Sequence, residues 1–433
     1  MALLHFPFAP QPTFPDDVKR FTQLLKEKTA KEKNNPFWEE LFADRKGTQL
    51  LAAIFGNSPY LSHIILKNTE FFELIIKQGY HAAFEVMIDS ANYLPANLKK
   101  EQLQSQLRIA KQRAALLIGM ADITGSWELE MVTSALSRFA ETAVNQSVNY
   151  LLREAVRNKE LKGSSNSGLI VLAVGKLGAG ELNYSSDIDL ILFFDPEKTP
   201  YIGRRTVQQF FIKLSCDLVS LLQDRTVDGY VFRTDLRLRP DPGSTPIAMS
   251  VQAAEQYYRT VGQNWERAAL IKALPIAGDT QAAEQFLKDI IQPFIWRRSL
   301  DFAAQEDIRS IKRQIDSKQQ TVPDNLAGYN IKIGHGGIRE IEFYAQTQQL
   351  IWGGRYSYLR MPATCDALRA LVRAKQVSEE VAEELIGIYR YYRMLEHRLQ
   401  MVHDEQTHKL PLDEVRAVTE NSGKQLCSFA IGE

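Results

Sequence analysis

The chain has 433 residues, 45% of them hydrophobic and 24% charged, and its 52 lysine and arginine residues balance its 52 aspartate and glutamate residues. This length allows two or three domains, and the zero net charge argues against a nucleic-acid partner. No run approaches the roughly 18 uninterrupted apolar residues of a membrane span. Three scattered cysteines without CxxC spacing, and an N-terminus without the features of a signal peptide, predict a cytoplasmic protein.

Residues 1–160 have the pattern of a helical domain. The stretch Gly56-Asn-Ser-Pro59 is typical of the end of one helix and the start of the next. No sustained repeat is present, so we expect a bundle and not a repeat array. Apolar residues recur at helical spacing in residues 48–55, 60–66, 71–76, 103–119 and 128–156.

The composition changes at residues 162–168, where Lys-Gly-Ser-Ser-Asn-Ser-Gly is typical of a loop. Strands are predicted at residues 169–174, 188–194 and 230–237, with a helix over 206–222. These elements predict a small α/β unit, and we assign residues 161–275 to a catalytic core.

Helical patterns return in residues 276–433, which we assign to a C-terminal helical region. The chain is therefore expected to be α+β and mostly helical. Its abrupt end closes no recognisable element, which is the pattern of a fragment. The predicted helices cover residues 281–287, 303–317, 338–351, 365–374 and 378–402.

Acidic side chains gather at the start of the second predicted strand. Asp187 and Asp189 are two residues apart, so they project from the same face of that strand. Two carboxylates this close repel each other unless a cation lies between them, and Mg²⁺ prefers such oxygen ligands. In the third predicted strand, Asp235 shares one face with Arg237 and Arg239. We expect Asp235 to complete a three-aspartate metal site and the two arginines to bind phosphate oxygens.

A glycine-rich turn precedes these aspartates. Glycines at Gly175 and Gly178 allow backbone N–H groups to approach phosphates closely, and Ser185 and Ser186 add hydroxyl donors. Lys176, in the same turn, is assigned with them to nucleotide binding. Together with the aspartates, this turn predicts metal-dependent nucleotidyl transfer with paired metals.

Each of these features has a structural explanation when it occurs alone. An Asp-x-Asp pair is most often a solvated turn, and an Arg-x-Asp-x-Arg run is usually an ion-paired strand face. The glycine cluster is not a P-loop, because it lacks Gly-Lys-Ser/Thr. The order of strand, glycine turn, Ser-Asp-Ile-Asp, strand, helix and Asp-containing strand gives the functional interpretation its specificity.

This order resembles the DNA polymerase β-type nucleotidyltransferase superfamily. Residues 175–190, Gly-Lys-Leu-Gly-Ala-Gly-Glu-Leu-Asn-Tyr-Ser-Ser-Asp-Ile-Asp-Leu, resemble the first half of the bifunctional glutamine synthetase adenylyltransferase/adenylyl-removing enzyme family more closely. Asn183, Ser185 and Ile188 favour the first half over the second. The similarity covers most of residues 45–412. Further similar segments are residues 233–240, 265–267, 271–273, 332–343, 395–401 and 406–408.

The resemblance implies a polymerase β-like core with a small mixed sheet, flanked by helical domains. It also implies removal of AMP from the adenylylated tyrosine of glutamine synthetase by phosphorolysis, which consumes phosphate and releases ADP. Asp187, Asp189 and Asp235 would hold two Mg²⁺ ions, with Mn²⁺ as a substitute. The implied partners are adenylylated glutamine synthetase and the uridylylated PII signalling protein; no nucleic acid or membrane is expected.

Two alternatives stay open from the sequence. One is a forward adenylyltransferase that attaches AMP from ATP, because ligands do not reveal the direction of a reversible reaction. The other is a non-catalytic fragment that binds glutamine synthetase or PII. Outside the core, Lys272 is either a phosphate ligand or a surface lysine. Glu342 belongs to a predicted ion-pair network on a helix, and His397 is predicted to be a packed helix residue.

Overall fold

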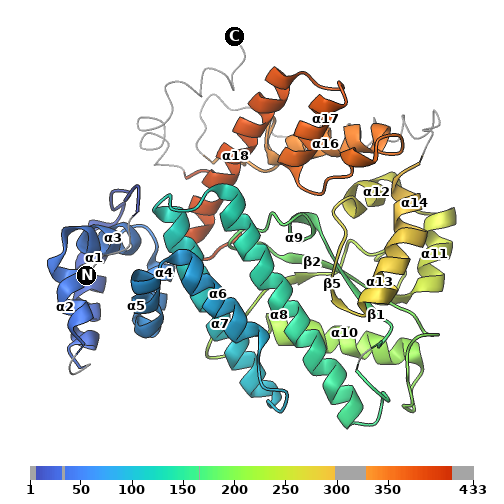
Figure 1. Cartoon of the computed structure of the whole chain (residues 1–433), viewed down its shortest axis with the longest axis horizontal. Helices are drawn as coiled ribbons and strands as arrows, with labels where there is room; N and C mark the ends of the chain where they lie inside the picture. Colours follow the sequence, from blue (N-terminus) through green and yellow to red (C-terminus); the bar gives the residue numbers. More distant parts are fainter. Residues whose placement is uncertain (1–5, 32–34, 165, 298–327, 412–433) are drawn as a thin grey trace. The chain divides into compact units, whose positions relative to one another are not determined.

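The computed structural model describes residues 6–31, 35–164, 166–297 and 328–411. The chain forms two compact units, and it passes between them several times (Figure 1). Unit 1 consists of Met1–Ala254, Leu274–Phe286 and Met401–Glu405; unit 2 consists of Glu255–Ala273, Leu287–Gln400 and Gln406–Glu433. The three domains expected at residues 1–160, 161–275 and 276–433 stay a prediction.

The N-terminal part of unit 1 is helical, as the apolar spacing predicts. Ser58 caps α4, because its hydroxyl accepts a hydrogen bond from the backbone N–H of Leu61 at 3.1 Å, and Pro59 follows in the first turn. The helices are α1 (Pro15–Thr29), α2 (Pro36–Ala43), α3 (Arg45–Phe55), α4 (Pro59–Lys67), α5 (Thr69–Gln78), α6 (Tyr80–Asn92), α7 (Lys100–Ile123) and α8 (Leu129–Arg157).

A small mixed sheet completes unit 1. Its strands run in the order β3-β2-β1-β5, and β4 also pairs with β2. β1 is antiparallel to β2 and β5, whereas β3 and β4 are parallel to β2. The mostly helical fold with a small mixed sheet is therefore confirmed. The strands are β1 (Leu169–Val174), β2 (Ile188–Phe194), β3 (Thr234–Asp235), β4 (Ala248–Ser250) and β5 (Leu274–Gly278).

Helices cover both faces of this sheet. Phe193 and Phe194 are neighbours in β2, so their side chains point to opposite faces. Phe193 contacts Phe286 of α13 (Thr280–Phe286), with ring centroids 4.6 Å apart. Phe194 stacks on Phe211 of α10 (Val207–Gln223), also at 4.6 Å. Burial of every residue of β1 follows from this two-sided cover.

The predicted third strand over residues 230–237 is wrong in extent. Only Thr234–Asp235 form a strand, and a turn follows. The Asp235 carboxylate accepts a hydrogen bond from the backbone N–H of Arg237 at 2.8 Å, which pulls the chain out of the extended conformation. The face expected to carry Asp235, Arg237 and Arg239 together therefore ends at Asp235.

Unit 2 has a separate apolar core between α16, α17 and α18. These helices confirm the predictions over residues 338–351, 365–374 and 378–402, whereas 303–317 lies outside the described residues. In this part of the chain the helices are α11 (Val251–Thr260), which begins in unit 1, α12 (Asn264–Leu270), η1 (Leu287–Ile291), α14 (Gln292–Ile295), α16 (Ile338–Trp352), η2 (Ser357–Leu359), α17 (Thr364–Arg373) and α18 (Glu379–Met401).

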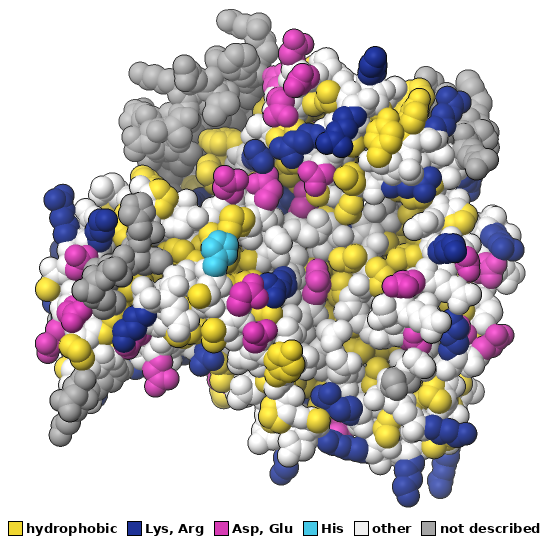
Figure 2. All heavy atoms as spheres, viewed as in Figure 1, with side chains coloured by type: hydrophobic (Ala, Val, Ile, Leu, Met, Phe, Trp, Pro, Cys, Tyr) yellow, Lys and Arg dark blue, Asp and Glu magenta, His cyan; other side chains and the backbone are white. Residues whose placement is uncertain are grey.

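On the face drawn in Figure 2, basic and acidic side chains are interspersed, in keeping with the zero net charge. None of the helices in the described ranges combines the length and the apolar character needed to cross a membrane.

Replacing Phe211 by alanine tests the packing of α10 on the sheet. This side chain is fully buried, so we expect the free energy of unfolding of unit 1 to fall by about 3–5 kcal/mol, measured by urea denaturation. Tyr93→Ala, at a residue that is 83% exposed, is the control and should change stability little. Equal losses in the two variants would contradict this packing.

Candidate active site

Strand pairing brings the predicted aspartates together. Asp189 is the second residue of β2, and Asp235 of β3 is its register partner in the parallel pair. Neighbouring strands lie about 4.8 Å apart, and register partners in a parallel pair point to the same face. Asp187 precedes β2 by one residue and shares the parity of Asp189. Three carboxylates therefore gather at one end of two adjacent strands.

Arginines compensate two of these carboxylates. Arg233 donates from Nε to Asp187 Oδ1 at 2.6 Å. Arg237 donates to both oxygens of Asp235, from Nε at 3.0 Å and from Nη2 at 2.5 Å. These bonds from Arg237 hold the pKa of Asp235 below its usual value, although partial burial opposes the shift.

The donor set suits a divalent metal, but the side chains do not yet converge on one. Carboxylate oxygens on adjacent strands are the ligands that Mg²⁺ prefers. Among the residues that the structure describes, no three acidic, histidine or cysteine side chains are placed to hold an ion. Asp187 and Asp235 each accept hydrogen bonds from an arginine, so Arg233 and Arg237 compete with a metal for these two carboxylates.

Gly175 places the glycine turn against Asp189. Its φ is +59°, in the left-handed region, and a Cβ at this residue would lie 2.5 Å from Asp189 Oδ2. The sequence predicted a close approach of this turn to phosphate; the structure shows a close approach to a carboxylate. Lys176 and Gly178 lie in the same single helical turn, α9 (Gly175–Gly178), directly after β1.

The two predicted serines differ in their surroundings. Ser185 is buried, and its hydroxyl donates to the backbone carbonyl of Asp404 at 3.0 Å. Its own carbonyl accepts a hydrogen bond from Arg233 Nη2 at 2.5 Å. Ser186 is half-buried beside Asp187. Ser185 therefore has a structural bond to a distant segment, and the nucleotide-binding role of both serines stays a prediction.

Arg239 helps to hold the turn that follows β3. Its guanidinium donates to the backbone carbonyls of Leu236 and Pro242, both at 2.8 Å. Arg237 is different, because its side chain is 82% exposed and touches Asp235 alone of the three aspartates. The predicted phosphate contact of Arg239 thus competes with these turn contacts, and the phosphate-binding role of both arginines stays a prediction.

Sequence reasoning missed the residues that connect Asp187 to the rest of unit 1. Arg233 Nη1 donates to the hydroxyl of Tyr230 at 2.8 Å, and this hydroxyl donates to Asp404 Oδ2 at 3.3 Å. Arg233 is two residues from Asp235 in the sequence, which did not indicate that its partner is Asp187. No sequence signal predicted that Asp404, more than 200 residues away from Asp187, returns to this place.

Unit 2 contains the other candidates, and they have structural roles here. Lys272 is buried and pairs with Glu342 at 3.0 Å, so the interpretation as a surface lysine is wrong. His397 is fully buried, which confirms a packed residue. Glu266 accepts from the backbone N–H of Gln263 at 2.7 Å and caps α12.

Comparisons with known proteins fit this geometry. The family model described as glutamate-ammonia ligase adenylyltransferase matches residues 48–289, more than half of the chain, including all three aspartates. The chain belongs to the glutamate-ammonia ligase adenylyltransferase family. A second family model, described as GlnD PII-uridylyltransferase, matches residues 308–427.

Several curated relatives carry the name bifunctional glutamine synthetase adenylyltransferase/adenylyl-removing enzyme. One from Rhizobium meliloti is 44% identical over 413 residues, which is 93% of this chain and 42% of the relative. One from Bradyrhizobium sp. is 46% identical over 84% of this chain and 38% of the relative. One from Bartonella quintana is 41% identical over 94% and 42%. The chain thus spans about two fifths of the length of these relatives.

The contact of Gly175 with Asp189 can be tested by a matched pair of substitutions. In Gly175→Ala the new methyl collides with the Asp189 carboxylate, and we expect both lower thermal stability and weaker Mn²⁺ binding. Gly180→Ala is the control, because Gly180 also has a positive φ of +69° but nothing lies within 4 Å of its Cβ position. Equal Mn²⁺ affinity in the two variants would contradict the proposed role of Gly175.

The Asp235–Arg237 pair predicts a pH dependence. Asp235 has a lowered pKa when folded, so the pair stabilises the fold above the ordinary carboxylate pKa, and this contribution is lost as the pH falls through the lowered value. The stability difference between the wild type and Arg237→Met should therefore be largest near neutral pH and vanish in strong acid. Thermal melts across this pH range measure it, and a difference independent of pH would argue against the pair.

Proposed function

We propose that the chain removes AMP from the adenylylated tyrosine of glutamine synthetase by Mg²⁺-dependent phosphorolysis. The observation that carries this proposal is the position of Asp187, Asp189 and Asp235 at one end of β2 and β3, beside the Gly175 turn, in a member of this family. The direction of the reaction is supported by the similarity of residues 175–190 to the first half of the bifunctional enzymes. The relatives' names contain both activities.

The chemistry requires charge neutralisation more than acid–base catalysis. An oxygen of inorganic phosphate attacks the phosphorus of the tyrosyl-AMP, the bond from phosphorus to the tyrosine oxygen breaks, and ADP and tyrosine result. Phosphate is already anionic, so its attack needs no strong base. The leaving phenol has a pKa of about 10, so its departure needs no strong acid. A bound divalent metal would neutralise the phosphoryl oxygens and stabilise the leaving phenolate.

The residues of this chain would prepare that step. Asp187, Asp189 and Asp235 would hold the metal. Binding of the metal by Asp235 would release the exposed guanidinium of Arg237. We infer that Arg237 then meets the incoming phosphate or the product ADP. Gly175, with Lys176, Gly178, Ser185 and Ser186 around the same turn, is proposed to position the nucleotide phosphates.

The comparisons support two proposed partners. The relatives' names refer to glutamine synthetase, which we propose as the substrate in its adenylylated form. The match of residues 308–427 to a PII-uridylyltransferase model supports an interaction with PII, and we propose its uridylylated form as the activator. A cytoplasmic location accords with these partners.

Incubation of the purified chain with adenylylated glutamine synthetase, Mg²⁺ and phosphate tests the function. We expect release of ADP that requires phosphate and falls on the order of 10³-fold in Asp187→Asn, because a metal ligand is lost. Asp217→Asn is the control, since Asp217 pairs with Lys213 on the surface of α10. Circular dichroism would establish that both variants are folded.

Other outcomes of the same assay would assign a different function. Transfer of AMP from ATP to unmodified glutamine synthetase, without ADP release, would identify a forward adenylyltransferase. The absence of both reactions, even with uridylylated PII, would identify a non-catalytic fragment that binds glutamine synthetase or PII.

A further inference from the structure

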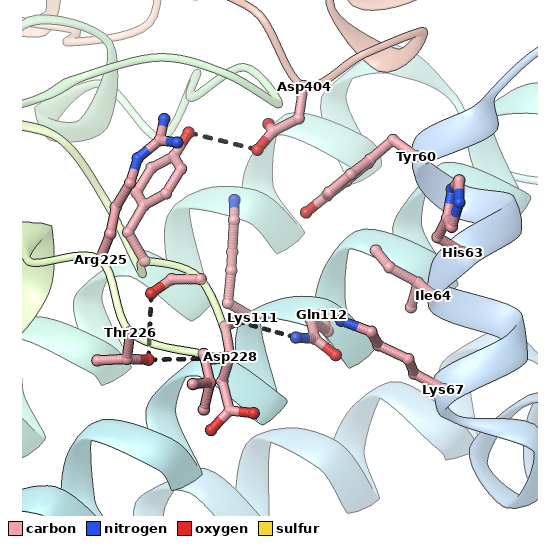
Figure 3. A pocket seen from close by; sticks show the side chains of 13 residues that line it. Tyr60, His63, Ile64, Lys67, Lys111, Gln112, Arg225, Thr226, Asp228 and Asp404 are labelled. Atoms are coloured by element: carbon pink, nitrogen blue, oxygen red, sulfur yellow. Dashed lines mark hydrogen bonds between the residues drawn. The ribbon is translucent and has the colours of Figure 1, made fainter.

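A pocket of about 360 Å³ in unit 1 is lined by none of the three aspartates. Its walls come from α4, α7, the turn after α10 and the segment around Asp404 (Figure 3). This volume lies at the lower end of the range for small-molecule sites, which begins at about 300 Å³. The pocket is therefore large enough for a small metabolite but not for a folded partner.

Lys111 is a buried cation that points into this pocket (Figure 3). Its residue is 6% exposed, and its ammonium lies 3.5 Å from the carbonyl of Tyr184 and 4.6 Å from the ring centre of Phe232. The structure records no ion pair for Lys111 with any described residue. A buried ammonium with such weak compensation favours an anion beside it.

The other charged side chains that line the pocket are of both signs, because Lys67 and Arg225 are opposed by Asp228 and Asp404. Arg225 and Lys67 are exposed at its edge and add positive charge. Burial lowers the pKa of Lys111 and raises the pKa of Asp404, and the attraction between the two offsets these shifts only in part. Asp228 accepts a hydrogen bond from the Ser105 hydroxyl at 2.8 Å.

A short series of hydrogen bonds connects this pocket to the candidate active site. Asp404, which lines the pocket, accepts from the Tyr230 hydroxyl, which in turn accepts from Arg233. Arg233 donates to Asp187 at 2.6 Å. An anion beside Lys111 would repel the Asp404 carboxylate. Movement of Asp404 would then disturb Tyr230, whose hydroxyl is bonded to both Asp404 and Arg233. Occupancy of the pocket would thus act on Arg233, the arginine that competes with a metal for Asp187.

We propose that this pocket binds a small molecule through a carboxylate or phosphate group held by Lys111, and that its occupancy changes the metal affinity of the three-aspartate site. The binding part stands independently of the proposed function, whereas the coupling part rests on it. Because coupling between two sites is reciprocal, the metal would change the affinity for the anion by the same factor.

Calorimetric titration of the whole chain without divalent metal tests the binding part. Succinate and inorganic phosphate serve as probes in separate titrations, so the one that binds identifies the group as carboxylate or phosphate. We expect Lys111→Met to weaken binding by about tenfold or more, because a charge-assisted hydrogen bond is lost. Lys213→Met, at a surface lysine of α10, is the control and should bind as the wild type does.

A second variant gives the opposite expectation. Asp404→Asn removes the negative charge opposite Lys111 and should tighten anion binding several-fold. This variant decides the question even if Lys111→Met does not fold. Equal affinity in the wild type, Lys111→Met and Asp404→Asn would overturn the proposal, and so would the absence of binding by both probes up to about 10 mM.

Titration with Mn²⁺ tests the coupling part. We expect a saturating anion to change the Mn²⁺ affinity by about fivefold or more, and Tyr230→Phe to abolish this change while keeping anion binding, since its hydroxyl makes both connecting bonds. Unchanged Mn²⁺ affinity in the wild type would overturn the coupling. Absence of any Mn²⁺ binding would count against the proposed function instead, because the anion titration does not depend on it.

Discussion

Mutual repulsion of three carboxylates is the constraint on which the candidate site depends. The pairing of β2 with β3 places Asp189 beside Asp235, and Asp187 shares the parity of Asp189, so three carboxylates lie at one end of the two strands. Such a cluster is stable only if cations neutralise it. In this structure Arg233 and Arg237 do so, and both arginines come from the segment that carries Asp235.

This arrangement makes the arginines and a metal alternative partners of the same oxygens. Arg233 is tied to Tyr230 and to the carbonyl of Ser185, whereas Arg237 is mostly exposed and reaches one aspartate. The two arginines therefore differ in how easily a metal can displace them from the aspartates. Arg237 can turn into solvent at little cost, while movement of Arg233 disturbs a connected set of hydrogen bonds that extends to Asp404.

The parts of the fold that the sequence predicts are those with local signals. Strands β1 and β2 were predicted with the observed bounds, because each is a short apolar run with β-branched or aromatic residues between loop residues. The third strand was overextended, because alternation continues through residue 239 while the Asp235 side chain captures the backbone N–H of Arg237. Periodicity does not report such a side-chain contact with the backbone.

Contacts between distant parts of the sequence were beyond prediction for a different reason. Asp404 belongs to a segment with no notable composition, and its meeting with Ser185 and Tyr230 follows from the path of the whole chain. Likewise, Gly175 was recognised as special, but the group it approaches, the Asp189 carboxylate, depends on how β1 and β2 pair. Local sequence patterns were thus enough to predict which residues belong to the site. They were not enough to predict which residues these side chains contact.

The interleaving of the two units has a consequence for synthesis on the ribosome. Unit 1 includes β5, which pairs with β1, and also Met401–Glu405, which contacts residues 185 and 230. Asp187, Asp189 and Asp235 are therefore synthesised long before Asp404, which completes the hydrogen-bonded surroundings of Arg233. Closing such long-range contacts late is slow, because the loop-closure entropy must be overcome first. The last part of unit 1 to form is thus the part next to Asp187, and unit 2 is largely synthesised by that time.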